Sequence, residues 1–353
     1  MTGLKKLLMW KAASGGGTAP QTETLSGSLV TFETTKARPL TQCRVDFLPK
    51  QSGSGDPSPE NVRPISGWDG CTVYRTGVNV FDGELEQGKL DNSGQKAEST
   101  ANIRSKNYIS VVSGKAYRVV YTVTSVGTAN MKLYRYNKNK EFLDSSWVSG
   151  NSTIITPSND VRYYRFYMDT AYSSSLYRDI AINRSDTATS YEPYTGTSYP
   201  VTWQSAGTVY GGYVDLVMGV LVAEYVGYTL DGTEYWSNSQ SGNLYRGVLV
   251  PSSSGLEVGK GNGTIYASYA KSSSSSSAWN IFIGSTGNIL LYLPTEIDNA
   301  NALKQYIAEH PLQVAYQLAT PITYTLTQQQ ITTLIGTNNI WSDAGDVTVT
   351  YTK

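Results

Sequence analysis

Aromatic and arginine side chains alternate along residues 161–168, which read VRYYRFYM. In a β-strand, successive side chains point to opposite faces of the sheet. One face then carries the residues of an ordinary core: Tyr164, Phe166 and Met168. The other face carries an arginine between two tyrosines: Tyr163, Arg165 and Tyr167. This second face has three competing interpretations, which are a sugar-binding platform, a contact with another subunit and a structural stack.

Sugar binding is the chemistry that these residue types supply best. Aromatic rings stack on the apolar C–H faces of sugars, while charged and amide side chains reach the hydroxyls. The candidate carbohydrate-binding residues are Tyr134, Tyr136, Trp147, Tyr163, Arg165, Tyr167 and Tyr172. The alternative is that these tyrosines cover strands or pack against a neighbouring domain or subunit. For the triad around Arg165, a cation–π stack or a subunit contact is favoured over direct sugar contact.

Catalytic groups are scarce in this sequence. His310 is the only histidine, and its place before Pro311 indicates a cation at the end of a helix rather than a base. Cys43 and Cys71 lack the spacing of a zinc site and are interpreted as small buried apolar residues, although a disulfide between them stays open. Two acids that meet in space can cleave a glycoside, but no acid is marked out. We therefore expect no enzyme activity, metal or cofactor.

Composition narrows the class of protein. The 353 residues have a net charge of zero and only 16% are charged, which argues against a nucleic-acid partner. There are 27 tyrosines against six phenylalanines, a bias typical of β-sheet proteins with wet, tyrosine-rich surfaces. Near the N-terminus the apolar run LLMW is too short for a secretion signal, and no stretch is long enough to insert in a membrane. We expect synthesis in a cytoplasm.

Short strands dominate the elements that the sequence predicts. The clearest lie at 103–112, 116–123, 131–136, 161–168 and 178–183, and the final strand at 346–352 is expected to pair near 29–33 or 43–48. Hairpin turns are predicted at Met218-Gly219, at Asp231-Gly232 and within the Asn/Lys-rich stretch YNKNKEF (136–142). Residues 51–70 predict an ordered loop, anchored by Val62, Ile65 and Trp68. Two helices are predicted at 298–311 and 327–336.

These elements predict an all-β protein with four segments. Residues 1–20 form a docking arm, and residues 21–78 and 200–353 together form a β-rich base that carries the two short helices. Residues 79–199, called the inserted unit below, form a β-sandwich or jelly roll placed within the base.

Two stretches of the chain resemble structural proteins from the tail modules of phages and prophages of Gram-positive gut bacteria. The first is GSGDPSPENVRPISGWDGCTVYRTGVNVFD (53–82). The second is HPLQVAYQLATPITYTLTQQQITTLIGTNNIWSDAGDVTVTY (310–351). The inserted unit, which ends in SDTATSYEPY, is similar to carbohydrate-binding-module-like jelly rolls in phage tail proteins.

The resemblance implies a virion protein of the tail tip or baseplate that attaches to a host surface glycan without catalysis. It also implies a homo-oligomer, most often a trimer, because weak sugar sites gain from avidity. The N-terminal arm would dock on other tail or baseplate proteins. The runner-up is a structural spacer or a head or tail decoration protein, and a glycan-cleaving enzyme is the least favoured alternative. Such a protein is made in the bacterial cytoplasm and acts on the released virion.

Overall fold

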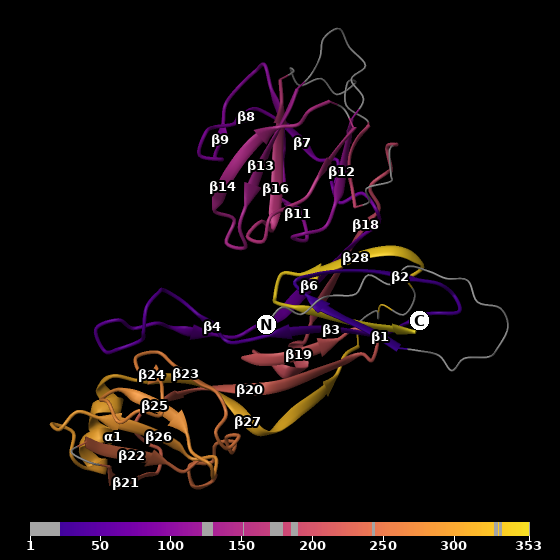
Figure 1. Ribbon diagram of the computed structural model, residues 1–353. Helices are drawn as coiled ribbons and strands as arrows, with labels where there is room; N and C mark the ends of the chain where they lie inside the picture. Colours follow the sequence, from indigo (N-terminus) through magenta and orange to yellow (C-terminus); the bar gives the residue numbers. More distant parts are fainter. Residues whose placement is uncertain are drawn as a thin grey trace, which may run out of the picture.

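The computed structural model describes residues 22–121, 130–150, 152–169, 179–184, 190–241, 244–327, 331 and 334–352. This part of the chain is mostly antiparallel β-sheet with one α-helix, α1 (Ala300–Glu309), so the all-β prediction is confirmed. Figure 1 shows the inserted unit and the base as two bodies joined by β6 (Gly70–Thr76) and β18 (Gly196–Thr202). The predicted arm at residues 1–20 lies outside the described residues. No helix in the described ranges is long and apolar enough to cross a membrane.

Two sheets of the base enclose its first core. The seven-stranded sheet runs in the order β1 (Thr22–Gly27), β29 (Val347–Thr352), β3 (Leu40–Phe47), β19 (Gly211–Asp215), β20 (Val220–Leu230), β27 (Leu312–Thr325), β23 (Ile265–Ala267). The four-stranded sheet runs in the order β18, β6, β28 (Gly336–Ser342), β2 (Leu29–Thr34). Alternate residues of both sheets point inward, and Val45, Val73 and Ile340 are fully buried between them.

The two ends of the described chain meet in the seven-stranded sheet. Residues of β1 pair with β29 from Thr22 opposite Thr352 to Gly27 opposite Val347. The other edge of β29 pairs with β3, and Val349 lies opposite Cys43. The predicted pairing of 346–352 with 43–48 is therefore confirmed, and the base needs both ends of the chain to complete this sheet.

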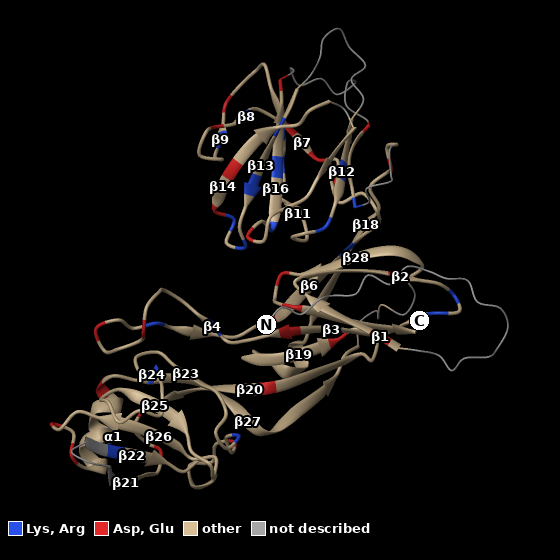
Figure 2. Cartoon of the chain, in the orientation of Figure 1, with Lys and Arg blue, Asp and Glu red and all other residues tan. Residues whose placement is uncertain are grey.

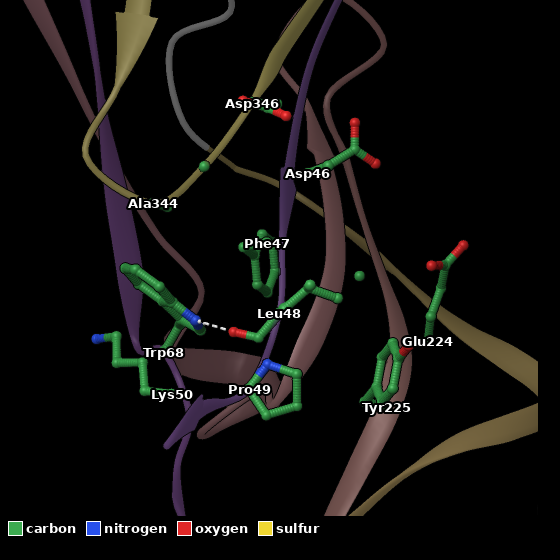
Figure 3. Close-up of a pocket in the computed structure, with 12 residues that line it drawn as sticks. Asp46, Phe47, Leu48, Pro49, Lys50, Trp68, Glu224, Tyr225, Ala344 and Asp346 are labelled. Atoms are coloured by element: carbon green, nitrogen blue, oxygen red, sulfur yellow. Dashed lines mark hydrogen bonds between the residues drawn. The ribbon is translucent and has the colours of Figure 1, made fainter. Parts of the chain in front are cut away.

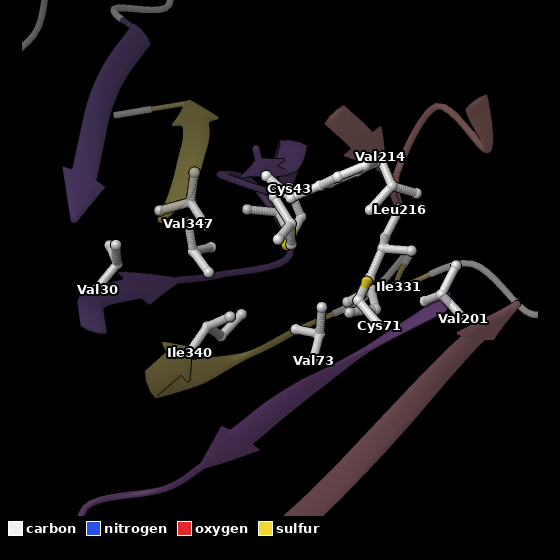
Figure 4. Packing of buried hydrophobic residues seen from close by; sticks show 14 of the residues in the cluster. Val30, Cys43, Cys71, Val73, Val201, Val214, Leu216, Ile331, Ile340 and Val347 are labelled. Atoms are coloured by element: carbon white, nitrogen blue, oxygen red, sulfur yellow. The ribbon is translucent and has the colours of Figure 1, made fainter. Parts of the chain in front are cut away.

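Both cysteines lie in the first core. Figure 4 shows Cys43 on β3 and Cys71 on β6 among valine, leucine and isoleucine side chains. Neither forms a disulfide, and both are buried, which confirms the prediction of small buried apolar residues. Burial raises the pKa of each thiol to about 12, so both stay protonated at neutral pH.

A second core of the base lies beneath α1. Its five-stranded sheet runs in the order β21 (Trp236–Ser241), β22 (Leu244–Leu249), β26 (Ile289–Leu293), β25 (Asn280–Ile283), β24 (Lys271–Ser272). The Asn299 side chain caps α1 by accepting from the backbone N–H groups of residues 301 and 302, and Leu303 and Ile307 are buried. Two 3₁₀ turns complete the base, at Gln204–Ala206 and Pro251–Ser253.

The structure confirms one of the two predicted helices. The predicted helix at 298–311 is α1, which ends before Pro311. Much of the second, at 327–336, lies outside the described residues, and its described positions carry no helix. Ile331 and Leu334 are buried, whereas Ile335 is 55% exposed and Gly336 already begins β28.

Two of the three predicted hairpins form. At 136–142, β13 (Met131–Tyr136) turns into β14 (Phe142–Trp147), and the two strands pair with each other. Gly219, with φ of 71°, lies at the turn between β19 and β20, which pair with each other. The prediction at Asp231-Gly232 is wrong, because β20 pairs with β27 and β21 pairs with β22. Gly232 packs against the backbone of α1: a Cβ at this position would lie 2.3 Å from the carbonyl oxygen of Lys304. Glycine is needed here for close packing with the helix and not for a hairpin turn.

Two sheets of the inserted unit enclose a core of their own. The larger runs in the order β14 (Phe142–Trp147), β13 (Met131–Tyr136), β16 (Tyr163–Met168), β10 (Ile103–Ser105), β7 (Leu85–Gln87), with β11 (Ile109–Ser110) beside β16. The smaller runs in the order β15 (Ser152–Ile155), β12 (Tyr117–Tyr121), β17 (Ile180–Asn183). A separate hairpin is formed by β8 (Lys89–Leu90) and β9 (Lys96–Ala97).

The loop between β4 (Lys50–Gln51) and β5 (Ile65–Ser66) is ordered around Arg63. The Arg63 guanidinium donates to the carbonyl oxygens of Ser52, Gly53 and Gly55. Both glycines have φ of 78°, a region that glycine enters at little cost. The prediction of an ordered loop is confirmed, and Ile65 is buried, but the predicted anchor Val62 is 55% exposed.

Candidate functional site

The predicted aromatic patch lies on one face of the larger sheet of the inserted unit. We call this surface the outer face, because the opposite face covers the core. Across it, Tyr136 on β13 lies opposite Tyr163 on β16, and Tyr134 lies opposite Arg165. The next pair along the same strands is Lys132 opposite Tyr167. The alternation read from the sequence therefore places these residues on one face, as predicted.

A hairpin covers the middle of the outer face. The Tyr134 hydroxyl donates to the Leu90 carbonyl oxygen at 2.9 Å, and the Tyr136 hydroxyl donates to the Gly94 carbonyl oxygen at 2.7 Å. Both tyrosines are at most 1% exposed. Burial raises the pKa of Tyr134 to about 12, with smaller contributions from Tyr167 and Asp91, so its hydroxyl remains a donor. These rings form a small second core beneath residues 88–97.

Local turn chemistry shapes this covering hairpin. The Asp91 carboxylate accepts hydrogen bonds from the backbone N–H groups of Ser93 and Gln95. Gly94 closes the turn with φ of 74°, and its N–H donates to the Asp91 carbonyl oxygen. Leu90 is 2% exposed and packs on the tyrosine rings. We call residues 88–97 the lid.

Arg165 is buried beside the lid, and its Nη2 donates to backbone carbonyl oxygens. Its Nη2 donates to the carbonyl oxygen of Ser105 at 2.6 Å, and it lies 3.6 Å from a carboxylate oxygen of Glu86. The ring of Tyr108 lies 5.3 Å from the guanidinium carbon, a cation–π distance. Burial lowers the pKa of Arg165, while nearby Tyr136, Tyr108 and Glu86 oppose that shift. The structural stack is thus the interpretation that these contacts fit.

One edge of the outer face stays open. Trp147 on β14 is 49% exposed, and its ring centroid lies 5.8 Å from that of Tyr167 in an edge-to-face contact. Lys132 lies between them in register, with its Nζ 5.7 Å from the Trp147 ring centroid. An exposed indole beside a phenol ring and an ammonium group can stack on a sugar and bond its hydroxyls. We call Lys132, Trp147 and Tyr167 the open edge.

The predicted site residues therefore divide into three groups. Tyr134, Tyr136 and Arg165 are buried and therefore offer a sugar no surface, contrary to their prediction as sugar contacts. Trp147, Tyr163 and Tyr167 retain exposed surface. Tyr172 lies outside the described residues.

Sequence reasoning missed the cations that accompany these rings. Lys132 belongs to the same alternating face as Tyr134, so the period of two could have identified it. Lys140 has φ of 62°, and its Nζ lies 5.2 Å from the ring of Tyr108 and 5.7 Å from that of Tyr163. Its position follows from the tight turn between β13 and β14, where the Asn/Lys composition alone gave the signal.

The base has a pocket of about 510 Å³ that is lined by three aromatic side chains, Phe47, Trp68 and Tyr225. Figure 3 shows Trp68 and Lys50 on one side of it and Tyr225 and Glu224 on the other. Lys50 Nζ lies 3.6 Å from the Trp68 ring centroid, and the indole N–H donates to the carbonyl oxygen of Leu48. Lys50 lies directly over the Trp68 ring and the indole N–H has a partner, whereas Lys132 lies 5.7 Å from the Trp147 ring, so this pocket fits a sugar less well than the open edge.

Comparisons with known proteins assign no family to the chain. No protein-family description and no curated protein sequence matches it. Among solved structures, T=1 particles derived from infectious bursal virus match with 6% identity and a TM-score of 0.13, over 94% of this chain and 78% of the other. The VP2 subviral particle of infectious bursal disease virus matches with 6% identity and a TM-score of 0.14, over 94% and 80%. Likenesses this weak carry no argument about fold or function.

Proposed function

We propose that this protein is a phage virion component of the tail tip or baseplate that attaches to a host surface glycan without catalysis. In this proposal the inserted unit is a jelly roll of the carbohydrate-binding-module type. The protein acts as a homo-oligomer, most simply a trimer, and its N-terminal arm docks on neighbouring tail proteins. It is made in the bacterial cytoplasm and works on the released particle.

The open edge is the observation that supports attachment. Trp147 exposes about half of its surface although large apolar side chains are usually covered, and Lys132 and Tyr167 flank it on fixed strands. The surrounding sheet holds these groups without loops, so little conformational entropy is lost when a ligand binds. A sugar ring stacked on the indole would place its hydroxyls near the Lys132 ammonium group.

A second candidate function has its own supporting observation. The lid buries much of the aromatic patch that the sequence presents, and the hydroxyls of Tyr134 and Tyr136 bond within the chain. This use of tyrosine is structural. It favours a baseplate spacer or a head or tail decoration protein, whose inserted unit would hold neighbours apart rather than bind a receptor.

Binding of the purified full-length protein to host polysaccharide tests the proposal. The probe is a panel of cell-wall polysaccharides extracted from Gram-positive gut bacteria, with reducing-sugar release measured in parallel. We expect at least one polysaccharide to bind without release of sugar. Trp147→Ala should weaken that binding about tenfold or more, because it removes the stacking surface.

Leu143→Ala is the matched control, since Leu143 is 41% exposed on the same strand and lies outside the open edge. It should bind as the wild type does. Equal binding by Trp147→Ala and wild type would reject the open edge as the site. An absence of binding to every polysaccharide, together with particles that fail to assemble without the protein, would favour the spacer.

A further inference from the structure

A hydrogen-bonded neck holds the inserted unit over the base. Strands β6 and β18 leave and re-enter the base side by side, paired from Gly70 opposite Thr202 to Thr76 opposite Gly196. Beyond them, the Arg184 guanidinium donates to the Asn339 side chain at 3.3 Å. Paired strands and side-chain contacts of this kind fix the separation of the two bodies better than a single flexible linker does.

Buried asparagines add further hydrogen bonds to the neck. The Asn79 side chain accepts from the backbone N–H groups of Phe81 and Ile182, and it donates to the carbonyl oxygen of Glu192. Asn339 donates to the carbonyl oxygen of Gly77 and is fully buried. These bonds tie the outgoing strand, the returning strand and β28 of the base into one junction.

A cleft lies between the two bodies beside this neck. One part has a volume of about 270 Å³ and continues into a second part of about 230 Å³, because both are lined by Ser28, Leu29, Val111 and Arg162. Leu29 belongs to β2 of the base, whereas Val111 and Arg162 belong to the inserted unit. Clefts between two parts of a protein are common ligand sites.

The lip of the cleft on the inserted unit is cationic. It carries Lys138, Arg162 and Tyr163, and Figure 2 shows Lys and Arg on the loops of the inserted unit that face the base. Nη1 of Arg162 donates to the Ser113 hydroxyl and to the carbonyl oxygens of Asn159 and Val161, which fixes the guanidinium in place. Within the described ranges, neither cation has an acidic partner.

The base lip supplies an aromatic ring and oxygen groups. Trp341 lines the cleft and stacks on Tyr74, with 5.5 Å between ring centroids and 14° between planes. Ser342 and the exposed carboxylate of Asp346 lie beside it. Asp346 can accept hydrogen bonds from sugar hydroxyls, and its single negative charge is outweighed by the two cations of the opposite lip.

We propose that this cleft binds an acidic saccharide, one whose sugars carry carboxylate or phosphate groups. The anion would lie against Lys138 and Arg162, and a sugar ring would stack between Tyr163 and Trp341. This site is separate from the open edge, and it rests on the proposed function only in taking the ligand to be a saccharide. A saccharide bound here would touch both bodies at once.

Isothermal titration calorimetry of the full-length protein tests the cleft. The probes are oligogalacturonate for carboxylate, a short glycerol-phosphate polymer for phosphate, and dextran as the neutral polymer. We expect one of the two acidic probes to bind, more weakly at high salt, and dextran not to bind. The double variant Lys138→Gln/Arg162→Gln should weaken that binding at least about tenfold. Trp341→Ala should weaken it about fivefold through the other lip.

A double variant of equal charge change separates a built site from general attraction. Lys89→Gln/Lys115→Gln alters two exposed lysines of the inserted unit that do not line the cleft, and it should bind within about twofold of wild type. Equal losses in both double variants, or no loss in the cleft variant, would overturn the proposal. So would the failure of both acidic probes to bind wild type.

The two proposals fail separately. Host polysaccharide that binds through Trp147, with no binding of either acidic probe, would remove the cleft and leave attachment standing. Binding of an acidic probe through the cleft, with no binding of host polysaccharide, would keep the cleft and remove the open edge. Thermal unfolding of each variant checks that the neck and both cores remain folded.

Discussion

The two faces of β16 bury aromatic rings by different means. On the inner face, the rings and the thioether lie among apolar residues of both sheets and are fully buried: Tyr164, Phe166 and Met168. On the outer face, Arg165 and the neighbouring tyrosines of β13 are buried almost as deeply. The lid accepts the hydrogen bonds of the two tyrosines, and the carbonyl oxygen of Ser105 accepts that of Arg165. Side chains on the inner face are therefore buried by apolar packing, whereas the aromatic side chains on the outer face are buried by a mainly polar lid.

This difference explains why a sugar-like composition can be structural. Tyrosine serves either purpose, because its ring buries apolar area and its hydroxyl can bond to water, to a sugar or to a carbonyl oxygen. Beneath the lid, the tyrosine hydroxyls form hydrogen bonds within the chain. Where the lid ends, at Trp147, the same face stays open.

Phe166→Ala should produce the largest effect, because it opens a cavity in the fully packed inner face. Phe166 is fully buried, and its ring contacts Phe81 edge to face at 5.1 Å. We expect the inserted unit to lose about 3–5 kcal/mol of unfolding free energy. Urea denaturation followed by fluorescence would measure the loss.

Leu143→Ala provides the baseline for that measurement, since a half-exposed side chain should cost about 0.5 kcal/mol or less. If Phe166→Ala were as mild as Leu143→Ala, the inner face would not be the core of the inserted unit.

Tyr136→Phe should produce a smaller effect and act only on the lid. It removes the hydroxyl that donates to the Gly94 carbonyl oxygen but keeps the ring, so the expected cost is about 1 kcal/mol. Amide hydrogen exchange should become faster in residues 88–97 while the inner face keeps its protection.

Tyr163→Phe is the matched comparison for the lid, because Tyr163 lies on the same face and is only half-buried. Exchange in residues 88–97 should be the same in this variant as in wild type. Unchanged exchange in Tyr136→Phe as well would show that the hydroxyl does not fasten the lid.

The sequence predicted the local elements well because they follow from local rules. Alternation located β13, β16 and β29, and a possible cap at Asp298 or Asn299 with Pro311 beyond it located α1. The hairpin at Asp231-Gly232 failed because the same Asp-Gly turn also suits a chain that passes beneath a helix. Turn residues indicate where the backbone bends, but they do not indicate which strand the next strand will pair with.

The candidate site was predicted less completely, for a physical reason. Tyr134 and Tyr136 have the spacing of exposed residues, and they are buried only because a mainly polar segment 42 to 44 residues earlier folds over them. The cleft residues Arg162 and Trp341 lie far apart in the chain and meet only through the neck. Contacts between two bodies of the protein produce no periodic pattern in the sequence, so sequence reasoning cannot predict them.

Glu86 should produce the smallest effect, and that effect depends on pH. Its carboxylate accepts from Lys96 at 2.7 Å and from Arg104 at 2.8 Å beside the lid. Burial acts to raise the pKa of Glu86, but the hydrogen bonds and charges of Lys96 and Arg104 outweigh it and hold the pKa below the ordinary value of 4.5. A lowered pKa in the folded state means a stabilising contribution that is present above pH 4.5 and is lost as pH falls through the folded value.

Glu86→Gln should therefore melt below wild type at pH 7, and the gap in melting temperature should close as the pH is lowered past 4.5. Glu84→Gln is the comparison, because Glu84 pairs with Lys106 at 3.4 Å with 58% of its side chain exposed, so its removal should change little at any pH. A gap for Glu86→Gln that stayed constant down to pH 3 would mean that packing, and not the charge of Glu86, connects the lid to the sheet. The outer face would then be held in the same way as the inner face, and the contrast between them would disappear.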